Sequence, residues 1–123
     1  MKKILILDDI DVNILLLKYI IKDIFKDIEE SVKIIEADGD IEFFQKYEED
    51  IDLFFLDINM PGKRNGLDLL KHLIVTGVKK PIIMQTAYLE YNNIVMDIGA
   101  TDIIHKPYDR LEIRTMLNKY LFD

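Results

Sequence analysis

The chain has 123 residues, of which 50% are hydrophobic and 32% are charged, and its net charge is −7. This composition is that of an ordinary globular domain, and the negative charge argues against a non-specific nucleic-acid binder. The absence of cysteine excludes disulfides, thiol nucleophiles and cysteine-ligated metals. No apolar run has the length of a secretory signal or a membrane span, so we expect a cytoplasmic protein with no membrane partner and no direct nucleic-acid contact.

The first strand is predicted at Lys3–Leu7, where consecutive apolar residues indicate burial on both faces of a parallel sheet. A helix follows to about Phe25, with Asp9 or Asp11 as its cap. The inward face of this helix is predicted to carry Ile14, Leu17, Ile21 and Ile24.

The second strand is predicted at Val32–Ala37 and the third at Ile51–Leu56. A weaker helix lies between them after a turn at 38–40, and it is marked by Ile41, Phe44 and Glu48. The third helix opens at Asn65-Gly66 and closes near Gly77. Its inward residues are predicted to be Leu67, Leu70 and either Leu73 or Ile74.

The fourth strand is predicted at Pro81–Gln85 and the fifth, short strand at Asp102–Ile104. The helix between them is indicated by Tyr91, Ile94, Val95 and Ile98. The last helix begins at Asp109 or Arg110 and ends at Leu121. Its aligned apolar residues are Ile113, Leu117, Tyr120 and Leu121.

Five alternating strand–helix units predict an α/β fold with right-handed connections. The expected architecture is a doubly wound α/β fold, a five-stranded parallel sheet with five helices on its two faces. Because no linker or second pattern is visible, we expect one domain over residues 1–123.

Three aspartates each follow a predicted buried strand: Asp8 and Asp9 after the first, and Asp57 after the third. Strand carboxyl ends meet at one edge of a parallel sheet, so we expect the three carboxylates to lie together. Carboxylates about 4–5 Å apart repel by several kcal/mol per pair at an effective dielectric near 20. Such a cluster either takes up protons or binds a hard cation, and oxygen ligands suit Mg²⁺. The alternative is that each acid only caps the following helix.

Two more strand ends add a hydroxyl and an ammonium group to the same edge, through Thr86 and Lys106. A carboxylate nucleophile, a metal, a cation and a hydrogen-bond donor are the parts needed to hold a transferred phosphoryl group. Taken singly, Thr86 is most often a turn residue and Lys106 a solvated charge. The joint arrangement favours phosphoryl chemistry.

Over its whole length the chain resembles the receiver domains of two-component response regulators. The matching motifs are Asp8-Asp9, Asp57 in Asp-Ile-Asn-Met-Pro, Thr86-Ala87 and Lys106-Pro107. The resemblance implies that Asp57 accepts a phosphoryl group from a sensor histidine kinase or a phosphotransfer protein. It implies that Thr86 bonds a phosphoryl oxygen and that Lys106 pairs with the acyl phosphate. The implied Mg²⁺ ligands are Asp8, Asp9, Asp57 and the backbone carbonyl of Asn59.

The resemblance implies a flavodoxin-like sheet with the strand order 2-1-3-4-5. It further implies a stand-alone signalling module, or a receiver excised from a hybrid kinase. Such a module catalyses its own phosphorylation and dephosphorylation, turns over no external substrate, and changes its binding to a downstream protein target. One alternative is a pseudo-receiver that binds a partner without phosphorylation. Another is a phosphatase or phosphotransferase of haloacid-dehalogenase type, which needs a second acid two residues after the nucleophile, where Asn59 stands.

Two positions depart from the family pattern. Four residues separate Pro61 from Gly66, one more than usual, which implies a longer loop beside Asp57. Ile103 stands where the family usually carries a tyrosine or phenylalanine whose rotation reports phosphorylation, so we expect a weaker or different readout. Tyr88 either flanks the phosphorylation pocket or covers the start of the fourth helix.

Overall fold

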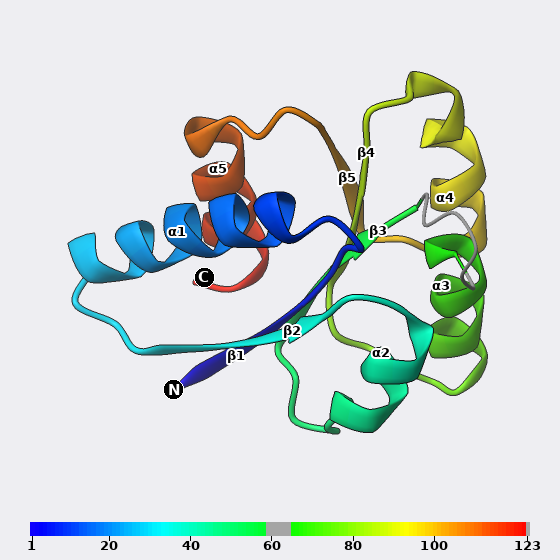
Figure 1. Ribbon diagram of the computed structural model, residues 1–123, viewed down its shortest axis with the longest axis horizontal. Helices are drawn as coiled ribbons and strands as arrows, with labels where there is room; N and C mark the ends of the chain where they lie inside the picture. Colours follow the sequence, from blue (N-terminus) through cyan, green and yellow to red (C-terminus); the bar gives the residue numbers. More distant parts are fainter. Residues whose placement is uncertain (59–64, 123) are drawn as a thin grey trace.

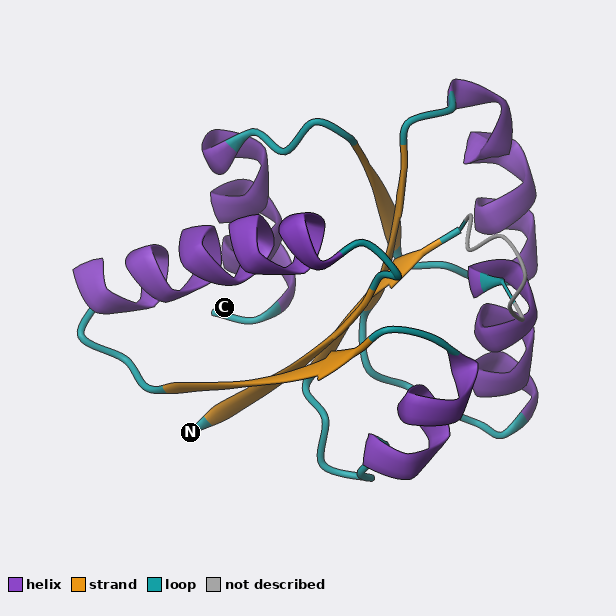
Figure 2. Cartoon of the chain, viewed as in Figure 1, coloured by secondary structure: helices purple, strands orange, loops and turns teal. Residues whose placement is uncertain are grey.

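The structure is a computed structural model, and it describes residues 1–58 and 65–122. One sheet of five parallel strands has the order β2-β1-β3-β4-β5, which confirms the predicted topology. The strands are β1 (Lys2–Leu7), β2 (Val32–Ala37), β3 (Leu53–Asp57), β4 (Ile82–Thr86) and β5 (Asp102–His105). Figures 1 and 2 show the strands as a twisted sheet through the centre of the molecule.

Helices cover both faces of this sheet, as expected of a doubly wound fold. The helices are α1 (Asp11–Asp27), α2 (Asp40–Lys46), α3 (Gly66–Val75), α4 (Asn92–Ile98) and α5 (Arg110–Tyr120), with a short 3₁₀ turn, η1, at Leu89–Tyr91. In Figure 1, α1 and α5 lie on one face of the sheet, and α2, α3 and α4 lie on the other. None of the helices in the described part of the chain is long and apolar enough to cross a bilayer.

The core forms two layers, one on each side of the sheet. Alternate residues of β1 point to opposite layers: Leu5 and Leu7 pack with the α2–α4 side, and Ile4 and Ile6 pack with α1 and α5. All five residues of β3 are buried, because helices cover it on both faces and strands flank it on both sides. This explains why β3 reads as an unbroken apolar run that ends at an acid.

The inward face of α2 differs from the sequence prediction. Phe43 is fully buried, whereas Ile41 and Phe44 are 71% and 40% exposed. Phe43 contacts the ring of Phe54 on β3 at a centroid distance of 6.3 Å. The helix ends at Lys46, so the predicted Glu48 lies beyond it. In a helix of only seven residues, the contact with β3 decides which aromatic side chain turns inward.

Two further local predictions change. The N-cap residue of α1 is Ile10, whose side chain offers no cap, so neither Asp9 nor Asp11 caps this helix. On α3, the alternative of Leu73 is confirmed, since Leu73 is buried and Ile74 is 37% exposed, but the inward face also includes the buried Leu69. By contrast, the predicted start of the last helix is confirmed: α5 begins at Arg110, and Asp109 is its N-cap residue, whose side chain accepts a hydrogen bond from the Leu111 N–H.

Candidate functional site

The three strand-end aspartates lie together at the carboxyl edge of the sheet. One oxygen from each of Asp8, Asp9 and Asp57 lies within 4.8 Å of the others. Asp8 and Asp57 are buried, at 0% and 4% exposure, and Asp9 is half-buried. Packing of β1 beside β3 in parallel register brings these residues together, because Leu7 pairs with Leu56 one position before the acids. The donor set consists of oxygen atoms only, which fits a hard divalent cation.

Lys106 connects two of these acids. Its Nζ donates to Asp8 Oδ2 at 2.8 Å and to Asp57 Oδ1 at 3.0 Å. Burial alone lowers the pKa of Lys106, but the hydrogen bonds and charges of Asp8 and Asp57 outweigh it and raise that pKa. The other oxygen of Asp8, Oδ1, accepts from the Ile10 N–H at 3.0 Å. Asp8 therefore links the ammonium group to the backbone turn that leads into α1.

The surroundings of Asp57 favour its protonated form. Burial and the charge of Asp8 raise the pKa of Asp57 to about 6, with a smaller contribution from Asp9, although Lys106 acts in the opposite direction. The buried negative charge is thus only partly compensated by one ammonium group. A second cation beside the three acids would stabilise the ionised form of Asp57.

Thr86 ends β4, next to the strand that carries Asp57. Its Oγ1 accepts a hydrogen bond from the Tyr88 N–H at 3.0 Å, a bond that does not use the hydroxyl proton. The Tyr88 ring is 54% exposed and meets Tyr91 edge-on at a centroid distance of 6.4 Å. This is the arrangement expected if Tyr88 covers the start of α4, the second of the two roles considered for it.

Gly66, at the start of α3, lies against the backbone of Asp57, a contact that the sequence did not predict. A Cβ atom at this position would lie 2.0 Å from the backbone oxygen of Asp57. The Gly66 N–H also donates to the Ile58 carbonyl at 3.1 Å. Only glycine permits α3 to begin this close to the backbone of Asp57. The predicted start of the helix at Asn65-Gly66 is confirmed, and Asn65 caps it by accepting a hydrogen bond from the Asp68 N–H at 3.1 Å.

Some predictions fall outside the described residues. They concern the backbone carbonyl of Asn59, which the resemblance implies as a metal ligand, and the extra residue between Pro61 and Gly66. Ile103 is half-buried and packs against the core on the α2–α4 side.

Two polar residues behind the acids were not singled out from the sequence. Gln85 is fully buried in β4, and Tyr108 is half-buried just after Lys106-Pro107, whose peptide bond is cis. One signal in the sequence could have identified Gln85, which is a single amide after the apolar residues of its strand. A buried polar group normally has a specific hydrogen-bond partner, so such an amide indicates a buried hydrogen bond.

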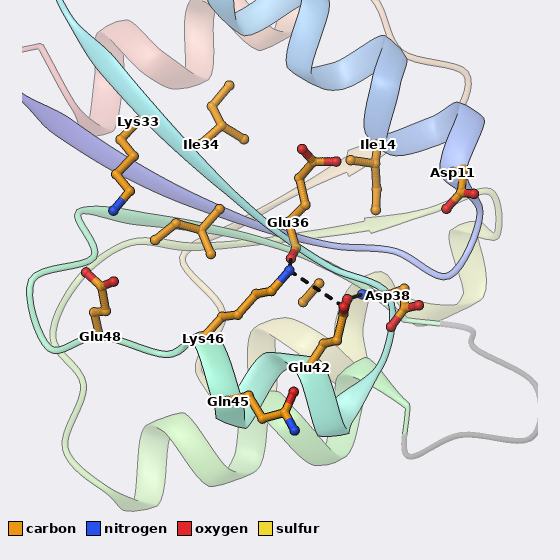
Figure 3. A pocket seen from close by; sticks show the side chains of 12 residues that line it. Asp11, Ile14, Lys33, Ile34, Glu36, Asp38, Glu42, Gln45, Lys46 and Glu48 are labelled. Atoms are coloured by element: carbon orange, nitrogen blue, oxygen red, sulfur yellow. Dashed lines mark hydrogen bonds and ion pairs between the residues drawn. The ribbon is translucent and has the colours of Figure 1, made fainter.

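A surface hollow of about 700 Å³ lies along the edge strand β2, and its lining does not include the acids Asp8, Asp9 and Asp57. Figure 3 shows Lys46 reaching from α2 toward Glu36 on β2. Its Nζ donates to the Glu36 carbonyl at 2.8 Å and pairs with Glu42 at 3.6 Å. Edge strands expose unpaired backbone groups, so this lysine protects the edge, and the hollow needs no ligand to explain it.

Comparison with known proteins agrees with this geometry. The sequence model of the response regulator receiver domain matches residues 4–118. The sensory transduction protein LytT of Bacillus subtilis is 32% identical over 98 residues, which cover 79% of this chain and 40% of LytT. The chain therefore spans less than half the length of this curated relative.

Solved structures share the fold. The signal receiver domain of a DNA-binding response regulator from Colwellia psychrerythraea has a TM-score of 0.88 at 18% identity, with full coverage of both chains. The receiver domain of the sensor histidine kinase PA1611 from Pseudomonas aeruginosa, solved with magnesium in its active-site cleft, has a TM-score of 0.81 at 18% identity. It covers 99% of this chain and 98% of that one. With strand order, strand-end acids and sequence match in agreement, the chain belongs to the response regulator receiver domain family of two-component signalling.

Proposed function

We propose that residues 1–123 form a receiver that accepts a phosphoryl group on Asp57 from the phosphohistidine of a sensor kinase or phosphotransfer protein. The observation that carries this proposal is the buried carboxylate of Asp57 held by Lys106 beside two more acids. An Asp57 oxygen attacks phosphorus and the phosphorus–nitrogen bond to histidine breaks. Water later attacks the same phosphorus, which releases phosphate and restores the carboxylate.

Lys106 and Thr86 have separate tasks in this reaction. Lys106 already holds Asp57 and Asp8, so its ammonium group orients the nucleophile and then balances the added negative charge. Thr86 has a hydroxyl proton that its bond from Tyr88 does not use, and this proton is donated to a phosphoryl oxygen. The resulting change in charge and hydrogen bonding alters the surface that a downstream protein binds.

Receiver domains generally bind Mg²⁺ at an acidic pocket, and we propose that Asp8, Asp9 and Asp57 hold it here, with the Asn59 carbonyl as a further ligand. The oxygen-only cluster supports this assignment, as does the raised pKa of Asp57. When bound, the ion neutralises charge on the phosphoryl oxygens.

Incubation with acetyl phosphate and Mg²⁺ followed by mass measurement tests the proposal. We expect the wild-type protein to gain one phosphoryl group and Asp57→Asn to gain none. A wild-type protein that gains none would support a pseudo-receiver. Steady hydrolysis of varied phosphate esters would support a phosphatase. The sequence argues against a phosphatase, because Asn59 has an amide at the position where the general acid would stand.

The metal assignment leads to a prediction about Asp9. We expect Asp9→Asn to weaken Mg²⁺ binding by at least about tenfold, because it removes a charged ligand. It should leave the free energy of unfolding in EDTA unchanged or raised, since like charges in the cluster repel. Titration with Mg²⁺ measures the affinity. The control is Asp11→Asn, which removes an exposed acid outside the cluster, and equal affinities in the two variants would refute the site.

A further inference from the structure

The buried amide of Gln85 lies directly beside the proposed nucleophile. Gln85 on β4 is the register partner of Asp57 on β3. Alternate residues of a strand share a face. Ile83 and Phe55, two positions earlier in their strands, both pack toward α1 and α5, so Gln85 and Asp57 face that side as well.

Gln85 also bridges the strands on either side of Asp57. Its Nε2 donates to the carbonyl of Leu7, the last residue of β1, at 3.3 Å. Because β1 and β4 flank β3, this bond spans the strand that ends in Asp57. Leu7 immediately precedes Asp8, so the amide connects the backbone that presents the acids with the strand that presents Thr86.

Tyr108 extends the connection to the loop that carries Lys106. Its hydroxyl donates to Gln85 Oε1. Burial, together with the charges of Asp8 and Asp57, raises the pKa of Tyr108, so the hydroxyl stays a protonated donor. On the other side of this loop, the Lys106 N–H donates to the Thr86 carbonyl at 2.8 Å. Figure 1 shows the ends of β4 and β5 and the start of α5 at the same end of the sheet.

We propose that Tyr108 and Gln85 are positioning residues, whose hydrogen-bonded bridge from the Lys106 loop to Leu7 holds the Lys106 ammonium on Asp8 and Asp57. The effect of this bridge on the phosphorylation rate rests on the proposed function, because the bridge acts on the step in which Asp57 accepts a phosphoryl group. Lysine has a long side chain with many rotamers. The position of the Lys106 ammonium group therefore depends on how firmly the backbone on both sides of Lys106 is held. The Thr86 carbonyl holds one side and the Tyr108 hydroxyl holds the other.

The test compares two tyrosine variants that each lose one hydroxyl. Tyr108→Phe removes the bond to Gln85. The control, Tyr120→Phe, removes a bond of the same kind from α5 to Asp102, at the opposite end of β5. We expect Tyr108→Phe to lower the maximal rate of phosphorylation by acetyl phosphate about tenfold. The Mg²⁺ concentration at half-saturation should stay within about twofold, because the metal ligands are intact. Tyr120→Phe should change neither.

A second measurement follows Lys106 itself, without phosphorylation. Reductive methylation with formaldehyde and a borohydride, analysed by peptide mass, reports how accessible each lysine amine is. Lys106 is paired with two carboxylates and its side chain is 18% exposed, so it should react slowly in the wild-type protein. We expect Tyr108→Phe to raise its rate about tenfold and Tyr120→Phe to leave it unchanged.

A double variant, Tyr108→Phe/Gln85→Met, guards against loss of folding. It removes both partners, so no side-chain group of this bridge is left buried and unpaired. We expect the same two effects as in the single variant.

Each outcome decides the proposal. Unchanged methylation of Lys106 in both Tyr108 variants overturns it, whether or not the protein is phosphorylated. Faster methylation with an unchanged phosphorylation rate overturns it as well. If the wild-type protein takes up no phosphoryl group while methylation of Lys106 still rises in Tyr108→Phe, the positioning role stands and the proposed function fails.

Discussion

Lys106→Met is expected to destabilise the protein by about 3–5 kcal/mol at pH 7 in EDTA. The substitution keeps the length of the side chain but leaves Asp8 and Asp57 buried at 0% and 4% exposure without their ammonium partner. Mg²⁺ should restore part of the loss by supplying positive charge to the same carboxylates. Lowering the pH to 5 should also restore part of it, because protonation of Asp57 removes one of the two charges. Urea unfolding under these three conditions measures the effect.

Lys18→Met is the matched control for Lys106→Met. Lys18 pairs with Glu36 at 2.7 Å, but both side chains are partly exposed. Such a surface pair contributes about 0–1 kcal/mol, and its loss should respond to neither Mg²⁺ nor mild acid. If Lys106→Met costs no more than Lys18→Met, the buried carboxylates do not depend on Lys106 as the geometry indicates.

Asp57→Asn is expected to remove a dependence of stability on pH. In the folded protein the pKa of Asp57 is about 6, against an ordinary value of 3.8. Between these values the folded state holds more protons at this site than the unfolded state, so the free energy of unfolding falls as pH rises. The full loss is up to about 3 kcal/mol and is reached above pH 6. Asp57→Asn lacks this loss. The free energy of unfolding of the variant should therefore rise relative to that of the wild-type protein between pH 4 and pH 7 in EDTA.

The pH slope, rather than the offset, is the informative quantity, because Asp57→Asn also removes one partner of Lys106 at every pH. Asp50→Asn provides a comparison of opposite sign. A hydrogen bond from Lys3 lowers the pKa of Asp50, so that carboxylate stabilises the protein above its ordinary pKa and the stabilisation is lost as pH falls. A difference between Asp57→Asn and wild-type that stays constant from pH 4 to pH 7 would contradict the raised pKa of Asp57.

The sheet and its functional edge were predictable because their signals are local. The strands β1, β3, β4 and β5 contain short apolar runs, and an acid, a threonine or a lysine marks the end of each. The rule that parallel strands present their carboxyl ends at one edge then placed Asp8, Asp57 and Lys106 together. Alternation of strands and helices was sufficient for a parallel sheet covered on both faces, and the resemblance to receiver domains supplied the order β2-β1-β3-β4-β5.

Helix faces were less predictable where a helix is short. On α1, a long amphipathic pattern identified Ile14, Leu17, Ile21 and Ile24, and all four are buried. On α2, the pattern predicted Phe44 as the inward residue, but Phe44 is 40% exposed and the adjacent Phe43 is buried. The position of Phe54 in the sheet decided that Phe43 turns inward.

The sequence by itself determined the fold class and the gathering of the strand-end acids, because each follows from local patterns and one packing rule. Only the tertiary structure decided that Lys106 bridges Asp8 to Asp57, that Gly66 lies against the Asp57 backbone, and that Tyr108 meets Gln85. These contacts join residues distant in the chain, up to 98 positions apart for Lys106 and Asp8. No spacing within one element encodes them, since they depend on how all the strands and helices pack together at once.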